Sequence, residues 1–509
     1  MTQPIRQFLL AGSLIALTVG FQPATTPWKS KFLTVNPQGT ILYHPDEKGN
    51  TIPDFSRVGY YQGDRPIPNV PVVMTVSPAD TSSQAIIQNA INEVAKRTPD
   101  KNGFRGAILL KKGTYKIPGT IYITTSGIVL RGEGDGEHGT RLIATGNTQR
   151  SLIEVMGDGW LEEIPGTRAI ITDAYVPTGA TSFHVESTAK FKVGDKIVLL
   201  RPGTDAWIKD LKMDVIAARS GTKQWQPGEY ELYYERVITK IKDNTIFIEN
   251  PVMMALEKKY GGGSIFKYDF EWRISNVGIE HLRCESTYAS DTAEDHGWTA
   301  IQINKIENGW VRNVTSRYFG FGCVHLEALA KNITVTNSRC LDAKSKITGG
   351  RRYSFNNDGQ QNLIMNCYST EGRHDYVTGA RVCGPNVFYN CTAKNTHADI
   401  GPHHRWASGT LYDNIVTDGE INVQDRGNWG SGHGWAGVTQ ILWNCTAKRA
   451  AVQSPWANGK NYCIGLKGGK YAGRLTGRPD GEWEGQNKQG LQPGSLFLAQ
   501  LKARKAMKK

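Results

Sequence analysis

Two stretches, NVFYNCTA at residues 386–393 and QILWNCTA at residues 440–447, show the pattern that decides the fold. Each is an apolar run that ends in Asn, Cys and small residues. Related triplets recur from about residue 277 onward, and their third positions follow one another at intervals of 24 to 30 residues. Those positions are Cys284, Val314, Ser338, Cys367, Cys391, Ile415 and Cys445. A short β-prone unit repeated at this interval indicates a solenoid.

The spacing and the residue types distinguish among solenoids. The apolar runs are five to eight residues long, which is the length of a strand, and no helical periodicity joins them. Leucine-rich repeats would place leucines at fixed offsets, and a WD-type propeller would need a longer period. We therefore predict an all-β, right-handed parallel β-helix in which each coil lies about 4.8 Å above the last. Coils of 29 or 30 residues then carry a longer loop.

The same register assigns a role to the cysteines. Four of the eight, Cys284, Cys367, Cys391 and Cys445, occupy one position in their coils and are expected to stack inward as small apolar side chains. Disulfides or metal ligands are the alternatives. The neighbouring position holds asparagines, whose side-chain amides can hydrogen-bond along the ladder. These are Asn313, Asn337, Asn366, Asn390, Asn414 and Asn444.

The chain before the repeat contains three further features. Residues 1–24 resemble a secretory signal, with Arg6 ahead of an apolar stretch from Phe8 to Phe21, so we expect a secreted or periplasmic protein. Residues 82–97 have one apolar face and are expected to form a helix that covers the open end of the solenoid. Within the predicted domain of residues 25–476, the repeat is lost over about 164–268, which indicates an inserted β subdomain. Residues 477–509 are polar and basic, and we expect a poorly ordered tail.

The charge of the chain points to an anionic partner. The formal net charge is +13, and five positive charges lie in residues 501–509. A basic body suits an acidic polysaccharide, nucleic acid or a membrane surface, although solubility alone is an alternative. Nucleic acid is the least expected partner because the chain shows no basic recognition helix or known nucleic-acid module. After the signal, no segment is long and apolar enough to insert into a membrane, and we expect a monomer.

Several motifs resemble a known superfamily. Residues 82–97, followed by Gly113-Thr114-Tyr115 and by residues 128–134 (IVLRGEG), are similar to the start of the pectate-lyase-like β-helix proteins. Residues 401–406 (GPHHRW) and 432–435 (GHGW) resemble secreted bacterial β-helix polysaccharide lyases. The resemblance implies the fold and an action on polysaccharides. It leaves the substrate open, because the superfamily also holds hydrolases, isomerases and phage tailspikes.

Basic and imidazole side chains concentrate on neighbouring coils. Arg352, Arg381 and Arg405 each lie fourteen residues after the repeat position of their coil, which predicts a groove for carboxylates or sulfates. Pairing with Asp375 and Asp399 is the alternative. The histidines there are His374, His397, His403, His404 and His433. General acid/base work, a metal site and a purely structural role are all open, but the spacing is not that of a helical zinc motif.

A uronate lyase needs a group that neutralises the carboxylate, a base for the C5 proton and an acid for the leaving oxygen. For the catalytic steps we predict a base at His403 or His404, with His374 as another candidate, Arg405 at the carboxylate, and Tyr376 sharing acid/base work. The predicted substrate-binding residues are Arg352, Arg381, Lys344, Lys346, Arg426, Trp406, Trp429, His433 and Trp435. Glucuronan, a glycosaminoglycan, alginate and pectin all remain candidate substrates.

Two other classes of function remain. A glycoside hydrolase would need paired carboxylates, for which Asp375 and Asp399, with Asp425, are the candidates. The same aspartates could bind Ca²⁺, but we expect a site without a metal or other cofactor because no rich carboxylate cluster is evident. A carbohydrate-binding solenoid without catalysis is the third class.

Overall fold

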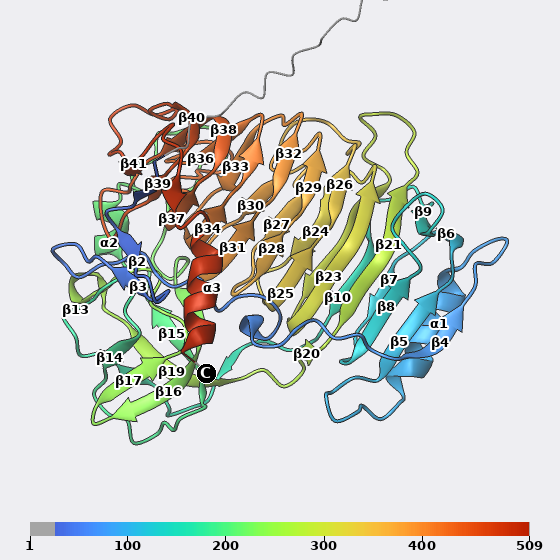
Figure 1. The fold of residues 1–509 in the computed structure, drawn as a ribbon, viewed down its shortest axis with the longest axis horizontal. Coiled ribbons are helices and arrows are strands. Elements are labelled where there is room, and N and C mark those ends of the chain that lie inside the picture. Colours follow the sequence, from blue (N-terminus) through green and yellow to red (C-terminus); the bar gives the residue numbers. More distant parts are fainter. Residues whose placement is uncertain (1–25, 508–509) are drawn as a thin grey trace, which may run out of the picture.

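The computed structural model describes residues 26–507, and most of these wind into a right-handed parallel β-helix with three faces (Figure 1). The first parallel sheet contains β4 (Val72–Val76), β5 (Gly106–Leu110), β8 (Ile128–Gly132), β21 (Gly278–Ser286), β23 (Ile306–Arg317), β25 (Ala330–Thr336), β28 (Leu363–Met365), β31 (Cys383–Tyr389), β34 (Ala407–Asp413), β37 (Gly437–Trp443), β39 (Tyr462–Ile464) and β41 (Glu482–Glu484). The predicted fold class is confirmed.

The other two faces follow the same parallel pairing. The second sheet contains β6 (Gly113–Ile117), β9 (Thr140–Ala144), the second halves of β21 and β23, β26 (Arg339–Leu341), β29 (Tyr368–Thr370), β32 (Thr392–Lys394), β35 (Val416–Thr417), β38 (Thr446–Val452) and β40 (Lys467–Lys470). The third contains β7 (Ile121–Ile123), β10 (Arg150–Met156), β22 (Gly297–Asn304), β24 (Gly322–Leu326), β27 (Phe355–Asn357), β30 (Tyr376–Thr378), β33 (Asp399–Pro402) and β36 (Glu420–Val423).

Alternate residues of the first sheet face the interior, where equivalent side chains stack from coil to coil. Phe388 of β31 and Tyr412 of β34 stack with ring centroids 5.3 Å apart, and Phe355 and Tyr376 of the third sheet do so at 5.6 Å. All eight cysteines are buried with free thiols. Cys284, Cys367, Cys391 and Cys445 lie in the core of the coil, which confirms the structural role predicted for these four. Apolar residues on both faces of the first sheet are buried, which explains why its strands read as continuous apolar runs.

The asparagine column forms the turn between the first and second sheets. All six asparagines adopt a left-handed backbone, with φ between 50° and 56°. Asparagine tolerates this conformation better than other non-glycine residues. The amides also bond along the column, from Asn390 Nδ2 to Asn366 Oδ1 at 2.7 Å and from Asn444 Nδ2 to Asn414 Oδ1 at 2.8 Å. Backbone shape and amide pairing therefore both explain the repeated residue.

Substitution at Asn390 separates these two contributions. Asn390→Ala and Asn390→Gly both lose the amide bond, but only alanine strains the left-handed backbone. We expect the free energy of unfolding of Asn390→Ala to fall about 1 kcal/mol further than that of Asn390→Gly, measured by urea denaturation. Equal losses would show that the backbone conformation does not select the residue.

A helix covers the first coil, as the sequence predicts. α1 (Gln84–Ala95) buries Ile87, Ala90, Ile91 and Val94 against the interior and lies at the end of the solenoid away from the inserted sheet. It begins at Gln84, two residues later than expected. Its position shields the end strands from pairing with other chains.

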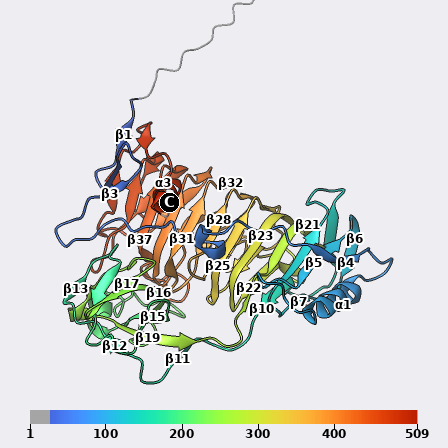
Figure 2. The same cartoon turned by 60° about the horizontal axis from the view of Figure 1, so that its bottom comes forward.

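The predicted insertion is an antiparallel sheet that packs on the solenoid (Figure 2). Its strands are β11 (Glu162–Glu163), β12 (Ala169–Ile170), β14 (Ser182–His184), β15 (Lys196–Arg201), β16 (Leu232–Lys242), β17 (Thr245–Ile248) and β19 (Ser264–Asp269). A short helix, α2 (Asp205–Asp210), follows β15. The core of this unit is continuous with outward-facing residues of the first sheet such as Val387 and Leu411.

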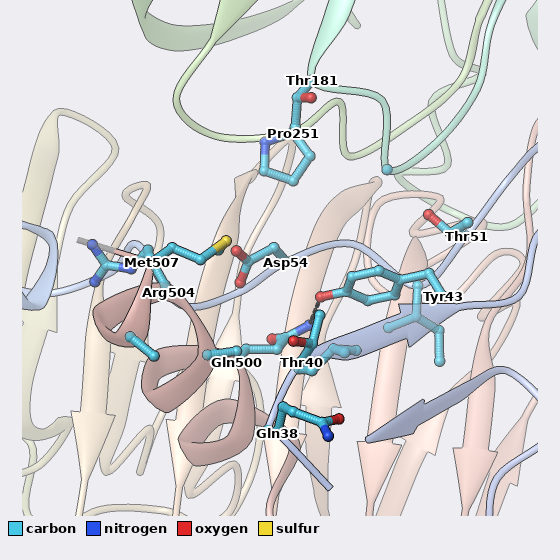
Figure 3. Close-up of a pocket in the computed structure, with 16 residues that line it drawn as sticks. Gln38, Thr40, Tyr43, Thr51, Asp54, Thr181, Pro251, Gln500, Arg504 and Met507 are labelled. Carbon is cyan, nitrogen blue, oxygen red and sulfur yellow. Dashed lines mark hydrogen bonds between the residues drawn. The ribbon is translucent and has the colours of Figure 1, made fainter. Parts of the chain in front are cut away.

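The expectation of a poorly ordered C-terminal tail is wrong. After residue 476 the chain adds β41, pairs β42 (Leu491–Gln492) with β1 (Trp28–Lys29), and ends in α3 (Leu496–Ala506). Ser495 Oγ caps this helix by accepting a bond from the Leu498 amide, and Leu496 and Phe497 are buried. A cavity of about 510 Å³ lies between α3, the N-terminal segment and the insertion. Figure 3 shows the residues that line it. The predicted signal at residues 1–24 lies outside the described residues. Within residues 26–507, no helix is long and apolar enough to cross a membrane.

Candidate functional site

Four of the five predicted histidines meet on one surface of the solenoid. His374 precedes β30, His403 and His404 follow the buried strand β33 directly, and His433 lies in the loop between β36 and β37. The ring centroids of His374 and His403 are 4.6 Å apart, and those of His403, His404 and His433 lie 4.9–5.0 Å from one another. His397 lies apart from this cluster and pairs with Glu371 at 2.8 Å.

A tyrosine that the sequence analysis missed completes the cluster. The hydroxyl of Tyr353 lies 3.2 Å from Nε2 of His403, and its ring centroid is 4.9 Å from that of His374. Tyr353 comes from the preceding coil, just before β27. The pairing of Phe355 with Tyr376 places Tyr353 beside His374, so the register of these strands is the signal that could have found it.

Hydrogen bonds link the members of this group and restrict their tautomers. If His403 Nε2 accepts the Tyr353 proton, then Nδ1 of His403 carries a proton and donates to His404 Nδ1, which lies 3.0 Å away. His374 Nδ1 lies 2.8 Å from the carbonyl oxygen of Asp399 and donates to it, so the buried Nε2 of His374 is the unprotonated nitrogen. The geometry therefore connects Tyr353, His403 and His404 in one line of proton donors and acceptors.

A buried ion pair between Arg426 and Asp399 lies next to His374. The guanidinium of Arg426 contacts the carboxylate of Asp399, and both side chains are about 5% exposed or less. Although burial alone raises it, Arg426 and His374 hold the pKa of Asp399 well below its usual range. Asp399 is therefore an anion that orients His374 and Arg426.

The histidines are held neutral. Burial and, to a smaller extent, neighbouring positive groups lower the pKa of His404 to about 4 and that of His433 to about 3. The pKa of His403 also falls well below its usual value because of burial and the nearby His374 and Arg426. Neutral imidazoles at pH 7 can accept protons, as a general base must.

Two of the three predicted arginines lie beside this cluster. Arg381 and Arg405 are in register, and the Arg381 amide donates to the Arg405 carbonyl at 2.8 Å. Arg405 Nη1 donates to the Tyr230 hydroxyl at 2.8 Å, and Arg381 Nη1 to the Glu229 carbonyl at 2.7 Å. The insertion therefore holds both guanidiniums, and both lower the pKa of His404.

The prediction that Arg352 shares this column is wrong. The long loop of its coil precedes β27, so register places Arg352 beside Arg373 rather than Arg381. Its guanidinium is buried and donates to the Ser345 carbonyl at 2.6 Å. Lys344 and Lys346 lie in the same loop, where they pair with Asp291 at 2.8 Å and Glu294 at 3.8 Å.

Several predicted aromatic contacts are buried instead. Tyr376 is 0% exposed inside the coil, and its hydroxyl donates to the carbonyls of Cys367 and Thr392. Trp406 and Trp435 are at most 1% exposed and pack beneath the insertion. Trp429 is half-buried, with the Arg474 guanidinium 3.9 Å from its ring centroid. The structure therefore does not place Tyr376, Trp406 or Trp435 where they could touch a substrate.

The aspartates do not form an open pair. The pairing of Val377 with Gly401 places Asp375 beside Asp399, as the offsets predict. Asp375 is buried and accepts a bond from Ser354 at 2.8 Å, and burial raises its pKa to about 6. Asp425 is buried against Arg478 at 2.8 Å. Between residues 26 and 507, no three His, Cys, Asp or Glu side chains come together in a group that could hold a metal ion.

Comparison with known proteins gives structural neighbours only. No model of a known protein family matches the chain, and no curated protein matches it. The tailspike protein gp49 from Pseudomonas phage LKA1 is 14% identical, with 79% of this chain and 70% of that chain covered and a TM-score of 0.43. The alginate lyase from Paenibacillus sp. str. FPU-7 is 10% identical, with 82% of this chain and 99% of that chain covered and a TM-score of 0.39. The polygalacturonase from Erwinia carotovora ssp. carotovora is 11% identical, with 85% of this chain and 96% of that chain covered and a TM-score of 0.40. At such low identity, function has to be argued from the site itself.

Proposed function

We propose that this protein is a polysaccharide lyase that cleaves a uronate-containing polymer by β-elimination, with Tyr353 and His403 at the reacting atoms. The observation that carries this proposal is the 3.2 Å contact between the Tyr353 hydroxyl and His403 Nε2 within a group of neutral histidines flanked by arginines. Arg405 and Arg381 are the groups that would bind the substrate carboxylate, because a guanidinium pairs with it in a bidentate manner. No metal takes part in this scheme.

Both nitrogens of His403 are engaged, so the tyrosine oxygen is the atom available to the substrate. As Tyr353 passes its proton to His403 Nε2, its oxygen takes the C5 proton of the uronate. The C–H electrons form the C4–C5 double bond, and the bond from C4 to the glycosidic oxygen breaks. Tyr353 then protonates that oxygen and recovers its proton from His403, so that the protein ends as it began. Burial raises the pKa of Tyr353, but Arg373 and Arg426 oppose the rise and favour the transient phenolate.

Absorbance during incubation with acidic polysaccharides tests the proposal. Elimination leaves a double bond conjugated with the carboxylate, which absorbs in the ultraviolet, and hydrolysis leaves only a new reducing end. We expect absorbance to rise on at least one uronate polymer, with and without a chelator. New reducing ends without absorbance would instead support the hydrolase, and loss of activity with chelator would show that a metal such as Ca²⁺ is needed.

The pH dependence of activity follows from the lowered histidine pKa values. A base with the ordinary histidine pKa of about 6.5 would lose about three quarters of its neutral form at pH 6. Because the pKa of His403 lies well below that value, its neutral form persists as the pH falls. We expect kcat/KM at pH 6 to stay within about twofold of its value at pH 7.5. A fourfold fall centred near pH 6.5 would contradict a buried, neutral His403.

A further inference from the structure

A cavity of about 400 Å³ lies between the insertion and the turns that follow the third sheet. From the insertion and the segment that leads into it, the cavity is lined by Trp160, Leu161, Glu231 and Tyr233. From the solenoid it is lined chiefly by Ala328, Leu329, Asp358, Gly359, Ala380 and Arg381. Its volume is within the range of small-molecule sites. None of the proposed catalytic side chains lines it.

Strand register places the cavity next to the histidines. Arg381 lies one coil before Arg405, and Asp358 lies one coil before Gly379, which pairs with the coil of His403. One coil is about 4.8 Å, which is close to the length of one sugar unit in a polymer. Asp358 also acts on His404, whose pKa it raises against the effect of burial. A polysaccharide that lies along the solenoid axis would therefore enter the cavity with the units next to the cleaved bond.

The walls of the cavity suit a pyranose ring. Trp160 is 66% exposed and Tyr233 is 41% exposed, so both present apolar ring surface that solvent reaches. Glu231 accepts a bond from the Tyr233 hydroxyl at 3.0 Å, and Asp358 accepts one from the Gly379 amide at 2.8 Å. Carboxylates have capacity for more than one donor, so both can also accept bonds from sugar hydroxyls or amides.

The charges of the cavity oppose a second uronate. Glu235, a third carboxylate in its wall, is neutralised by Arg273 and Lys331. Two further carboxylates, Glu231 and Asp358, remain in the wall of the cavity. The His325 ring lies 3.1 Å from the Asp358 carboxylate, and the guanidinium of Arg381 also lines the cavity. A sugar carboxylate in this space would lie close to two carboxylates of the protein, which is unfavourable at partly buried positions.

Building on the proposed lyase function, we infer that this cavity binds an uncharged sugar next to the uronate, and that the natural substrate alternates uronate with uncharged units. We call it the neutral-sugar cavity. The arginines beside the histidines bind the uronate, while the carboxylates and aromatic rings of the neutral-sugar cavity bind its neighbour. A site with these two positions favours alternating polymers, such as unsulfated uronate–N-acetylhexosamine chains, over homopolymers of uronate.

Two substrate classes and three variants test the inference. We expect kcat/KM, followed by ultraviolet absorbance, to be at least tenfold higher on hyaluronan or unsulfated chondroitin than on polyglucuronate, polymannuronate or polygalacturonate. Trp160→Ala should raise KM on the preferred polymer about tenfold. Trp272→Ala, which changes a tryptophan that is 62% exposed outside the cavity, should leave KM unchanged. Glu231→Lys should raise kcat/KM on the homopolymers and so reduce the ratio of kcat/KM between alternating polymers and homopolymers.

The inference is overturned if homopolymers are cleaved as fast as alternating ones, or if Trp160→Ala behaves like Trp272→Ala. If no polymer is cleaved, the lyase proposal fails. The inference about the cavity is then tested by calorimetry, which measures the binding of oligosaccharides prepared from the same polymers. Weaker binding of alternating oligosaccharides to Trp160→Ala than to wild type then supports the cavity, and equal binding overturns it.

Discussion

Tyr353→Phe is expected to lower kcat on the uronate polymer by about 10²–10⁴-fold, the range typical of a lost acid/base group. The substitution removes one oxygen and keeps the ring that packs against His374 and His403. Because the proposed carboxylate-binding residues Arg381 and Arg405 are unchanged, KM should change little. Initial rates of absorbance over a range of substrate concentrations separate the two constants.

Tyr389→Phe is the matched control. Tyr389 is half-buried on β31, where its ring lies 5.7 Å from that of Phe497, on the α3 side of the solenoid. Its hydroxyl has no place in the proposed reaction, so this variant should keep wild-type kcat. If Tyr353→Phe also keeps full activity, the tyrosine takes no part in the reaction, and His403 or His404 is the base instead.

The fold could be predicted from the sequence because the repeat acts at every coil. The asparagine column must adopt a left-handed backbone, and the position after it is buried inside the coil and holds a small or an apolar side chain. Both requirements recur, so each is visible several times in one chain. The C-terminal helix was missed because it occurs once, and because its few buried residues, Leu496, Phe497, Gln500 and Arg504, lie within a basic segment.

The site was predicted only in part, for a related reason. His403, His404 and Arg405 follow a buried strand with no loop between, so counting residues placed them correctly relative to His374. Arg352 was misplaced because thirteen residues separate β26 from β27, whereas five separate β29 from β30 and four separate β32 from β33. The same offset of fourteen therefore falls before the third-sheet strand in the coil of Arg352 and after that strand in the coils of Arg381 and Arg405. Tyr353 was missed for the same reason, since its partner is visible only once β27 is aligned with β30.

The aromatic residues show a second limit. Trp406 and Trp435 lie next to the histidines in sequence, as sugar-binding tryptophans would, yet they form the base on which the insertion packs. Trp207 of the insertion meets Trp406 edge to face, with ring centroids 4.9 Å apart. Nothing in the repeat indicates where an inserted domain returns to cover the solenoid. That contact also places Tyr230 beneath Arg405, so the insertion helps to build the site.

One buried carboxylate, that of Glu235, attaches the insertion to the solenoid. Among the substitutions considered, removal of this carboxylate should lower the free energy of unfolding most. Glu235 is 0% exposed on β16 and binds Arg273 through two bonds of 2.7 and 3.0 Å. It also accepts bonds from Lys331 of β25 at 2.9 Å and from Tyr268 at 2.5 Å. Although burial alone raises its pKa, Arg273 and Lys331 hold it far below the usual glutamate range.

Glu235→Gln should lower the free energy of unfolding by about 3–5 kcal/mol, because it removes the carboxylate that pairs directly with two buried cations, Arg273 and Lys331. Glu163→Gln is the control, since it breaks a glutamate–arginine pair of the same insertion whose partners are about one third exposed. That pair should contribute at most about 1 kcal/mol. Chemical denaturation measures both, and equal losses would show that the buried network does not hold the insertion. Because Arg381 and Arg405 depend on Glu229 and Tyr230 of that insertion, Glu235→Gln should also raise KM on the uronate polymer, whereas Glu163→Gln should not.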